Sequence, residues 1–347
     1  MIKQRLILSI KVLVSLVVGV GASIGGQFAW ALDLKNYPRL QESVAPLIAK
    51  GIYTDAELQG VFANITLKEE VVRKKANAAE KVLTWGRGGK RGTGYRGIFI
   101  QQDRIEQGAQ FWRNNESVMN QAKSKLGLNG AMISAIIGVE TKFGQNKGRH
   151  LVLESIATHA NRGSKLQFGQ LPIFLTLVKQ GHLDINAKGS YSGAMGIPQF
   201  ISSSYRDFGI DFDNDNIVDL VTNTDDAIGS VANYFKKHDW RENEPVMFQV
   251  RPKNAQAAAE LKRMSVTKIN SRVKPKTTLQ AVSHLIENLP ENMSVSTPLS
   301  IFRFLDENDE PEYFLGYHNF YVIMRYNHSA LYARAVYQLS QEIAKAY

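Results

Sequence analysis

Apolar residues recur with a helical period along most of this 347-residue chain, and one stretch of different character interrupts that period. Runs such as "RIEQGAQFW" and "AIGSVANYFKK" place apolar side chains three and four residues apart, which is typical of amphipathic helices. From about Pro245 to Gly316, the segments "EPVMFQVRP", "VTKINSRVKPKTTL" and "STPLSIFRFL" are instead rich in Val, Thr, Ile and Phe, with turn residues between them. This pattern predicts a mainly α, α+β protein in which a small strand-rich insert interrupts a helical body.

The first 31 residues predict a signal peptide. Three basic residues, Lys3, Arg5 and Lys11, precede or begin the apolar run "KVLVSLVVGVGASI", and "AWA" at residues 29–31 fits the small-residue cleavage pattern. The run is short and contains Gly and Ser, which favours cleavage over the alternative of a retained membrane anchor. We therefore expect an exported protein whose mature chain begins near Leu32.

Composition narrows the compartment and the class of ligand. The chain contains no Cys, which excludes disulfides and a lipid-modified N-terminal Cys, so we expect a periplasmic protein that is not a lipoprotein. The formal net charge of +10 favours an acidic polymer as ligand, and export argues against nucleic acid. The basic stretch "WGRGGKRGTGYRG" at residues 85–97 lacks the Ser or Thr that follows a P-loop lysine, and we interpret it as a flexible surface loop.

One carboxylic acid stands in an apolar helical run. In "MISAIIGVE", Ile133, Ile136 and Ile137 lie on the same helix face as Glu140. A carboxylate on that face is costly unless it is paired, or unless burial raises its pKa and keeps it protonated. Taken alone, such a Glu is more often a hydrogen-bonded structural residue than a catalyst. HExxH and GxSxG signatures are absent from the sequence, so the remaining candidates for chemistry are Glu140 and two polar segments, "KGSYSGAMGIPQF" at residues 188–200 and "RYNHS" at residues 325–329.

The stretches "GVETKFG", "GSYSGAMGIPQF", "DAIGSVANYF" and "NFYVIMRYNHS" occur in this order. Together they resemble the lytic murein transglycosylase B family, over about residues 103–339. The resemblance implies a lysozyme-like helical core at residues 101–244, completed by a C-terminal helix at residues 317–347. Residues 32–100 then form an N-terminal helical region, in which Thr54 and Glu57 have the spacing of a capping box and residues 67–85 have a helical period. The strand-rich insert occupies residues 245–316.

The resemblance also implies an activity. The Glu of "GVET", which is Glu140, is the family's single catalytic acid, and it would cleave the β-1,4 bond between N-acetylmuramic acid and N-acetylglucosamine in peptidoglycan. Most glycosidases need a second carboxylate, but here the substrate's own C6 hydroxyl attacks C1 and forms a 1,6-anhydro ring. Two alternatives stay open: a muramidase that uses water at the same site, and a non-catalytic cell-wall-binding protein.

By position, the resemblance extends to five residues that would line the substrate cleft. Tyrosine rings can stack on sugars, and amides can bond to hydroxyl and N-acetyl groups, although Tyr332 could equally be an ordinary core residue. The implied partner is the peptidoglycan glycan strand, with no nucleic acid and no organic cofactor, and further cell-wall proteins could bind. The implied cleft residues are Ser190, Gln199, Tyr234, Asn327 and Tyr332.

A second motif, "DFDNDNIVDLVTNTDD" at residues 211–226, predicts a calcium loop. Carboxylates at its positions 1, 3 and 5 and a backbone carbonyl at position 7 are hard oxygen ligands. It departs from a standard EF-hand, since Asn216 replaces the Gly and Thr222 replaces the closing Glu. The family resemblance implies closure by Asp226, with Asp225 as a competitor. We expect a structural role for Ca²⁺, because the loop is remote in sequence from Glu140 and its ligands would leave little open coordination for substrate; the alternative is a solvated acidic turn. The predicted ligands are Asp211, Asp213, Asp215, Ile217 and Asp226.

Overall fold

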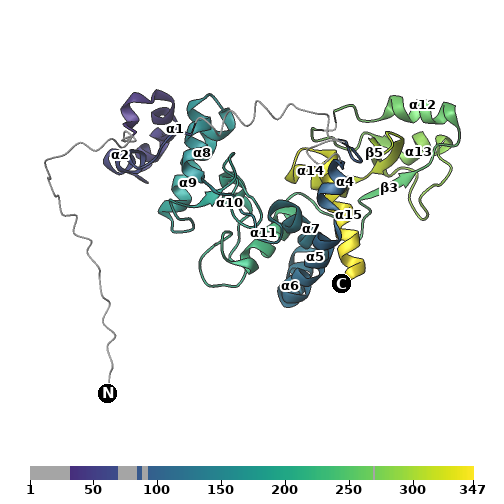
Figure 1. Ribbon diagram of the computed structural model, residues 1–347, viewed down its shortest axis with the longest axis horizontal. Helices are drawn as coiled ribbons and strands as arrows, with labels where there is room; N and C mark the ends of the chain where they lie inside the picture. The colour runs from purple at the N-terminus through teal and green to yellow at the C-terminus, as the bar shows by residue number, and fades with distance from the viewer. Residues whose placement is uncertain (1–31, 69–83, 88–92, 269) are drawn as a thin grey trace, which may run out of the picture.

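The computed structural model describes residues 32–68, 84–87, 93–268 and 270–347. The predicted signal peptide at residues 1–31 and most of the helical run predicted at residues 67–85 lie outside these ranges. The described elements form an elongated arrangement, with the N-terminal helices at one end and the insert at the other (Figure 1). None of the described helices is long and apolar enough to cross a membrane.

The N-terminal helices pack against a helical pair that belongs to the central part of the chain (Figure 1). The predicted capping box is confirmed, because the Thr54 N–H donates to Glu57 Oε2 at 2.8 Å and the Glu57 N–H donates to Thr54 Oγ1 at 3.2 Å. The Tyr53 hydroxyl donates to the Leu175 carbonyl at 2.9 Å and ties the two parts together. The elements are η1 Leu34–Asn36, α1 Pro38–Ala49, α2 Asp55–Ala63, α8 Val152–Asn161 and α9 Lys165–Lys179.

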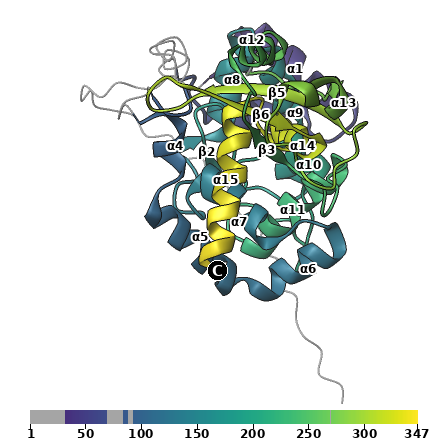
Figure 2. The same cartoon turned by 90° about the vertical axis from the view of Figure 1, so that its right-hand side faces the viewer.

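Helix α7, Gly130–Thr141, lies at the centre of the core and carries the predicted catalytic acid. Asn129 caps it by accepting a hydrogen bond from the Met132 N–H at 2.9 Å. Its residues from 130 to 138 are all buried, as expected for a helix that is apolar on every side. Figure 2 shows α15 running alongside α5 and α7. The surrounding helices are α5 Gln102–Asn114, α6 Glu116–Leu126, α11 Thr224–Lys237 and α15 Ala330–Ala346.

Three short elements border this core. Strands β1, His150–Leu151, and β2, Lys188–Gly189, form an antiparallel pair, and α10 spans Ser202–Phe208. Residues Gly94–Phe99 form helix α4, so the interpretation of residues 85–97 as a flexible surface loop is wrong for the described residues that α4 includes. The Tyr95 N–H donates to the Thr84 carbonyl at 3.0 Å, and α4 packs against α15. The packing of α4 against α15 joins segments that are far apart in the sequence, so no local sequence pattern predicts it.

The insert contains the predicted small sheet, antiparallel throughout, in the strand order β3-β6-β5-β4. Alternate residues of β5 face different cores: Leu299 and Ile301 face a small apolar cluster of the insert, whereas Phe302 and Phe304 face the main core. Both faces of the sheet are therefore buried, which joins the insert firmly to the helical body. The strands are β3 Met247–Val250, β4 Thr277–Thr278, β5 Pro298–Leu305 and β6 Pro311–Gly316.

The insert also contains helices that the sequence pattern missed. Residues Ala255–Met264 form α12, in which the Asn254 side chain accepts from the Ala257 N–H at 2.9 Å and an Ala-rich segment follows. Residues Leu279–Val282 form α13, followed by the 3₁₀ turn η3 at Ser283–Leu285. The strand predicted from "VTKINSRVKPKTTL" is reduced to the two residues of β4.

The single C-terminal helix predicted for residues 317–347 is two helices. Helix α14 spans His318–Tyr326 and α15 begins at Ala330. Ser329 starts the second helix, since its hydroxyl accepts from the Tyr332 N–H at 3.4 Å. The break lies inside the "RYNHS" motif, so it separates the motif's residues onto different elements.

Candidate active site

The end of α7 holds Glu140 in a fixed position. Glu140 is the next-to-last residue of the helix and is partly exposed, whereas its neighbour Thr141 is buried. The Thr141 hydroxyl donates to the Ile197 carbonyl at 2.9 Å and accepts from the Gly144 N–H at 3.0 Å. These bonds join the helix end to the "GIPQF" loop, so the acid sits where helix and loop meet.

The backbone directly after Glu140 turns sharply. Lys142, Phe143 and Gly144 have backbone φ values of 50°, 59° and 82°. These are left-handed backbone conformations, which residues other than Gly rarely adopt. An ion pair of 3.0 Å between Lys142 Nζ and Asp103 Oδ2 supports the turn from helix α5. Strained backbone of this kind persists only where the surrounding structure holds it, and it is concentrated at functional sites.

The carboxyl of Glu140 receives one strong hydrogen bond. The Tyr332 hydroxyl of α15 donates to Glu140 Oε1 at 2.6 Å. Burial raises the pKa of Glu140 from 4.5 to about 7, and the hydrogen bond from Tyr332 acts in the opposite direction. A carboxyl with a pKa near 7 can donate a proton at neutral pH and can also take one back.

Two further tyrosines, which the sequence analysis did not select, complete the surroundings of Glu140. The ring of Tyr326 stacks on Tyr332 with centroids 6.4 Å apart, and its hydroxyl donates to the Pro198 carbonyl at 2.6 Å. Burial and then the nearby Glu140 raise the pKa of Tyr326 well above its usual value, so it stays neutral. Tyr95 of α4 hydrogen-bonds to the Ser329 side chain. Burial and, to a smaller extent, the charge of Glu140 raise the pKa of Tyr95. Tyr326 stands inside a quoted motif, but nothing in the sequence around Tyr95 points to the site.

Three of the five predicted cleft residues line one cavity of about 430 Å³. Gln199 has a φ of 51°, and its side-chain amide donates to the Gly196 carbonyl at 2.9 Å. Tyr234 is buried and its hydroxyl donates to the Arg325 carbonyl at 2.7 Å, while Asn327 is exposed. Tyr326 also lines this cavity and thereby connects it with Tyr332 and Glu140. The cavity is lined by Gln199, Phe200, Ile201, Ser204, Tyr234, Arg272, Arg325, Tyr326, Asn327 and His328.

The other two predicted cleft residues have different surroundings. Tyr332 is buried and contacts Glu140 directly. Ser190 follows β2, and its hydroxyl accepts from the Ala194 N–H at 3.0 Å and lies 3.3 Å from the Ser192 hydroxyl. Within the described residues, no hydrogen bond links Ser190 to Glu140, and neither Ser190 nor Glu140 lines the cavity of Gln199 and Asn327.

The acidic motif brings three carboxylates together. Oxygens of Asp211, Asp213 and Asp226 lie within 4.8 Å of one another. Asp226, at the start of α11, is fully buried and accepts from the Phe212 and Asp219 N–H groups, each at 2.7 Å. Burial raises the pKa of Asp226. A buried acid that faces two other acids fits a divalent cation, which would favour the charged form of all three.

The remaining predicted metal ligands are arranged differently. Asp215 Oδ1 accepts from the Ile217 N–H at 2.8 Å, and Asp215 is not part of the three-carboxylate group. Ile217 has an exposed side chain and would offer only its carbonyl. Asn216, which replaces the EF-hand Gly, has a φ of 71°; Asn tolerates this left-handed conformation better than most residues. Asp225, the competitor of Asp226, lies outside the group.

Comparisons with known proteins agree with this architecture. Residues 37–341 match the family model described as Transglycosylase SLT domain. The chain is 32% identical over 329 residues to membrane-bound lytic murein transglycosylase B of Escherichia coli (strain K12). The matched segment covers 93% of this chain and 86% of the relative.

Solved structures give the same result. Soluble lytic transglycosylase SltB1 from Pseudomonas aeruginosa superposes with a TM-score of 0.79 and 33% identity, covering 89% of this chain and 99% of that one. The Escherichia coli lytic transglycosylase Slt35 in complex with calcium superposes with a TM-score of 0.76 and 30% identity, covering 93% and 99%. The chain therefore belongs to the lytic murein transglycosylase B family and has its mainly helical, lysozyme-like fold.

Proposed function

We propose that this protein is a peptidoglycan lytic transglycosylase in which Glu140 acts first as acid and then as base. The observation that carries the proposal is the single carboxyl at the end of α7, with a pKa raised to about 7 and a hydrogen bond from Tyr332. Among the described residues, burial and the Tyr332 hydroxyl are what shift the pKa of Glu140, and no second carboxylate contributes. An acid without a second carboxylate beside it suits a reaction in which the substrate supplies its own nucleophile.

The reaction follows from these groups. Protonated Glu140 donates its proton to the glycosidic oxygen, and the bond from that oxygen to C1 of N-acetylmuramic acid breaks. The C6 hydroxyl of the same sugar then forms a bond to C1, and its proton passes to the Glu140 carboxylate. The products are a free 4-hydroxyl on N-acetylglucosamine and a 1,6-anhydro ring. The short hydrogen bond from Tyr332 orients the carboxyl and stabilises it between the two proton transfers.

The glycan would lie along the cavity that Gln199, Tyr234 and Asn327 line, and would reach Glu140 past the stacked rings of Tyr326 and Tyr332. Asn327 offers an exposed amide to sugar hydroxyl or N-acetyl groups, and the Gln199 side chain fixes the loop that meets the end of α7. The Tyr234 hydroxyl already has a partner, so its proposed role is to shape the wall with its ring. Ser190 and Tyr332 complete the proposed set. The partner is the peptidoglycan strand, and no nucleic acid or organic cofactor enters the proposal.

We also propose that the loop at residues 211–226 binds Ca²⁺ as a structural ion. The grouping of Asp211, Asp213 and Asp226 supports this proposal, and Asp215 and the Ile217 carbonyl are the remaining proposed ligands. Slt35, the relative cited above, has been solved in complex with calcium. A bound ion would neutralise the acids and hold the start of α11 against the loop.

The substrate also implies a location. Murein is a polymer outside the cytoplasmic membrane, and the name of the Escherichia coli relative refers to murein. We therefore propose that residues 1–31 are a cleaved export signal and that the protein works in the periplasm, without a lipid anchor. Further cell-wall proteins are proposed only as potential partners.

The decisive experiment is mass spectrometry of purified peptidoglycan after digestion. We expect ends of 1,6-anhydro-N-acetylmuramic acid from the wild type, lighter by one water than hydrolysis products. Glu140→Gln should lower the cleavage rate by about 10² to 10⁴ or more. The matched control is Glu106→Gln, which replaces an exposed acid on α5. Reducing ends would support a muramidase instead, and an unchanged rate in Glu140→Gln would make the Glu structural.

A further inference from the structure

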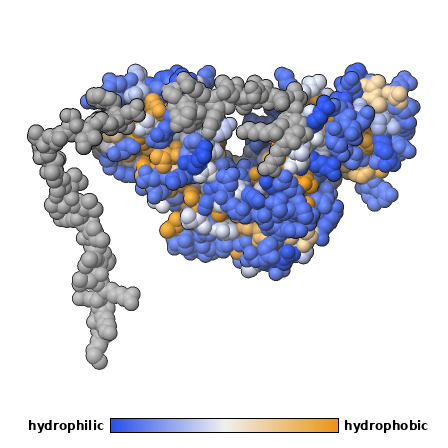
Figure 3. All heavy atoms as spheres, in the orientation of Figure 1, coloured by the Kyte–Doolittle hydropathy of each residue, from blue (hydrophilic) through white to orange (hydrophobic). Residues whose placement is uncertain are grey.

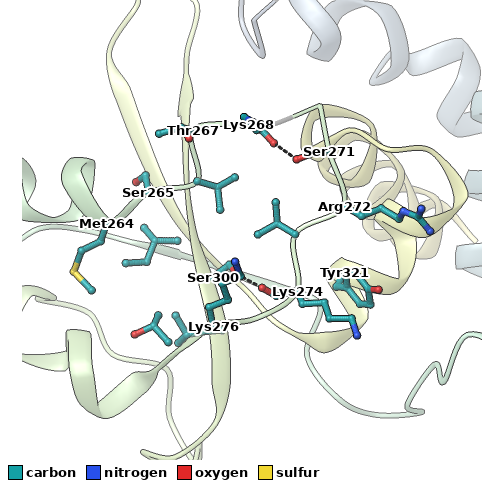
Figure 4. A pocket seen from close by; sticks show the side chains of 15 residues that line it. Met264, Ser265, Thr267, Lys268, Ser271, Arg272, Lys274, Lys276, Ser300 and Tyr321 are labelled. Carbon is teal, nitrogen blue, oxygen red and sulfur yellow. Dashed lines mark hydrogen bonds between the residues drawn. The ribbon is translucent and has the colours of Figure 1, made fainter.

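A second cavity, of about 680 Å³, lies in the insert and is bordered by a basic segment (Figure 4). Its floor is apolar, with Val266, Val273 and Ile301 among the residues that form it. Hydrophilic residues cover most of the insert on the face that Figure 3 shows. The cationic residues that line the cavity are Lys268, Arg272, Lys274 and Lys276, and we call the last three the basic track.

The positive charges of the basic track have no acidic partners. Among the described residues, Arg272, Lys274 and Lys276 form no salt bridge, although most other surface arginines of the insert do, for example Arg251 with Glu287 at 3.3 Å. No Asp or Glu lines this cavity in the described part of the chain. Three like charges within five residues repel one another, so an anionic ligand would relieve that repulsion.

The basic track extends to the cavity that holds three of the predicted cleft residues. Arg272 lines both the insert cavity and the cavity that Gln199 and Asn327 share. Glu140 does not itself line that shared cavity, but Tyr326 does, and the Tyr326 ring stacks on Tyr332, which hydrogen-bonds to Glu140. Figure 4 shows Arg272 and Lys274 extending to the same side of their segment, the side on which Tyr321 of α14 lies. Lys274 Nζ is 6.0 Å from the centre of the Tyr321 ring. Burial and then the charges of Arg272 and Arg325 lower the pKa of His328, which is consistent with both cations acting on the shared cavity.

We infer that the basic track binds the carboxylates of the acidic peptide that is attached to the muramic acid unit in the active site. This inference rests on the proposed function. Peptidoglycan offers anionic groups on its peptides, whereas its sugars carry no charge as long as the lactyl carboxyl of N-acetylmuramic acid is amide-linked to the peptide. An apolar floor edged by cations suits short peptides that carry small side chains and carboxylates. The continuity through Arg272 favours a peptide covalently joined to the bound sugar over a separate polymer.

The test measures binding rather than turnover, in the Glu140→Gln background. The ligands are soluble glycan chains with their peptides intact and the same chains after an amidase has removed the peptides, which leaves one lactyl carboxylate on each N-acetylmuramic acid. The two ligands therefore differ in the carboxylates of the peptide itself. Arg272→Gln with Lys274→Gln should weaken binding of the peptide-bearing chains by roughly three- to tenfold relative to the peptide-free chains, because each exposed ion pair contributes modestly. The same difference should shrink at high salt.

The matched control is Lys253→Gln with Lys262→Gln. It removes two charges from the same insert, but neither residue lines the two cavities, so the preference for peptide-bearing chains should stay at the wild-type level. An unchanged preference in the Arg272 and Lys274 variant, or an equal loss with both ligands, would overturn the inference. Neither result depends on the chemistry of the cut, whereas the absence of anhydro ends in wild-type digests would overturn the proposed function.

Discussion

At Glu140, an apolar environment and one hydrogen bond act on the same carboxyl in opposite directions. Burial raises the pKa to about 7, and the Tyr332 hydroxyl, which donates at 2.6 Å, favours the charged form. The balance suits a residue that must give up a proton and then recover it. Tyr332 is therefore the residue through which the acidity of the site can be altered without removing the acid.

Tyr332→Phe should shift the pH profile of the enzyme. The variant keeps the ring but loses the hydrogen bond that stabilises the Glu140 carboxylate, so the pKa of Glu140 should rise further. Cleavage requires protonated Glu140, and the alkaline limb of the rate profile should therefore move to higher pH. Release of anhydro products measured from pH 5 to 9 checks this. A limb that moves to lower pH would contradict the assigned role of the bond.

Glu140 should also make folding stability depend on pH. Its folded pKa of about 7 exceeds the ordinary 4.5, so the folded state binds the proton more tightly than the unfolded state does. The contribution to stability is complete below about pH 4.5 and is lost as the pH rises through 7, with an upper limit of about 3 kcal/mol. Denaturant unfolding should show this loss in the wild type and not in Glu140→Gln. If the unfolding free energies of the wild type and Glu140→Gln changed with pH in the same way, the folded state would not raise the pKa of Glu140.

At the scale of elements, α15 joins the catalytic core to the insert. The same helix that carries Tyr332 carries Arg334, which is buried and pairs with Glu312 of β6 at 2.7 Å. The Arg334 guanidinium lies 4.1 Å from the centre of the Trp85 ring and 4.4 Å from that of Phe314. Burial lowers the pKa of Arg334 to about 10, so it is still charged at neutral pH.

Breaking this pair should destabilise the fold. Arg334→Met leaves the Glu312 carboxylate with only the Gln249 amide, at 3.2 Å, and because the Glu312 side chain is 24% exposed the loss should stay below the cost of breaking a fully buried pair, which is about 3 to 5 kcal/mol. Replacing both residues, as Arg334→Met with Glu312→Leu, should recover much of that loss, because no charge is then left unpaired. Denaturant unfolding of the single and double variants measures the coupling. Additive effects would show that the ion pair itself contributes little.

The loop at residues 211–226 is tied to the start of α11, because Asp226 accepts from the Phe212 and Asp219 N–H groups, and α11 in turn packs against α6, α7 and α10. A ligand that binds only the folded protein stabilises it by about 2.7 kcal/mol at a hundredfold excess over Kd. Calcium should therefore raise the melting temperature relative to chelator, and Asp213→Asn should abolish this increase. Asp225→Asn, an acid outside the three-carboxylate group, should retain it. A melting temperature that is equal in chelator and in millimolar calcium would remove the ion from the proposal.

At the scale of the whole molecule, the chain surrounds one catalytic helix with parts that are distant in sequence. Helix α7 packs against α5, α6, α11 and α15, and the insert sheet is buried on both faces between its own small core and the main one. Glu140 consequently lies where the end of α7, the "GIPQF" loop and α15 meet.

Several features of the protein could be predicted from sequence because they depend on local physics. The apolar helical run with Glu140, the capping box of Thr54 and Glu57, and the strand-rich composition of the segments that form β5 and β6 each leave a periodic or short-range pattern. The mainly α, α+β class follows from such patterns, whereas the family follows from the resemblance of the quoted motifs, and both are confirmed. Helix α12 was missed although its Asn254 cap and Ala-rich segment are local signals, so that error lies in the interpretation.

Other features were decided only by the tertiary structure. Tyr332 reaches Glu140 across 192 residues, Tyr95 comes from a segment interpreted as a loop, and Asp226 rather than Asp225 faces the acidic loop because of how α11 is rotated. The raised pKa of Glu140 likewise depends on how many distant segments exclude water from it. Sequence alone determined which residue types the chain offers and which helix carries the acid. Packing decided their distances and protonation, because both depend on neighbours that sequence spacing does not specify.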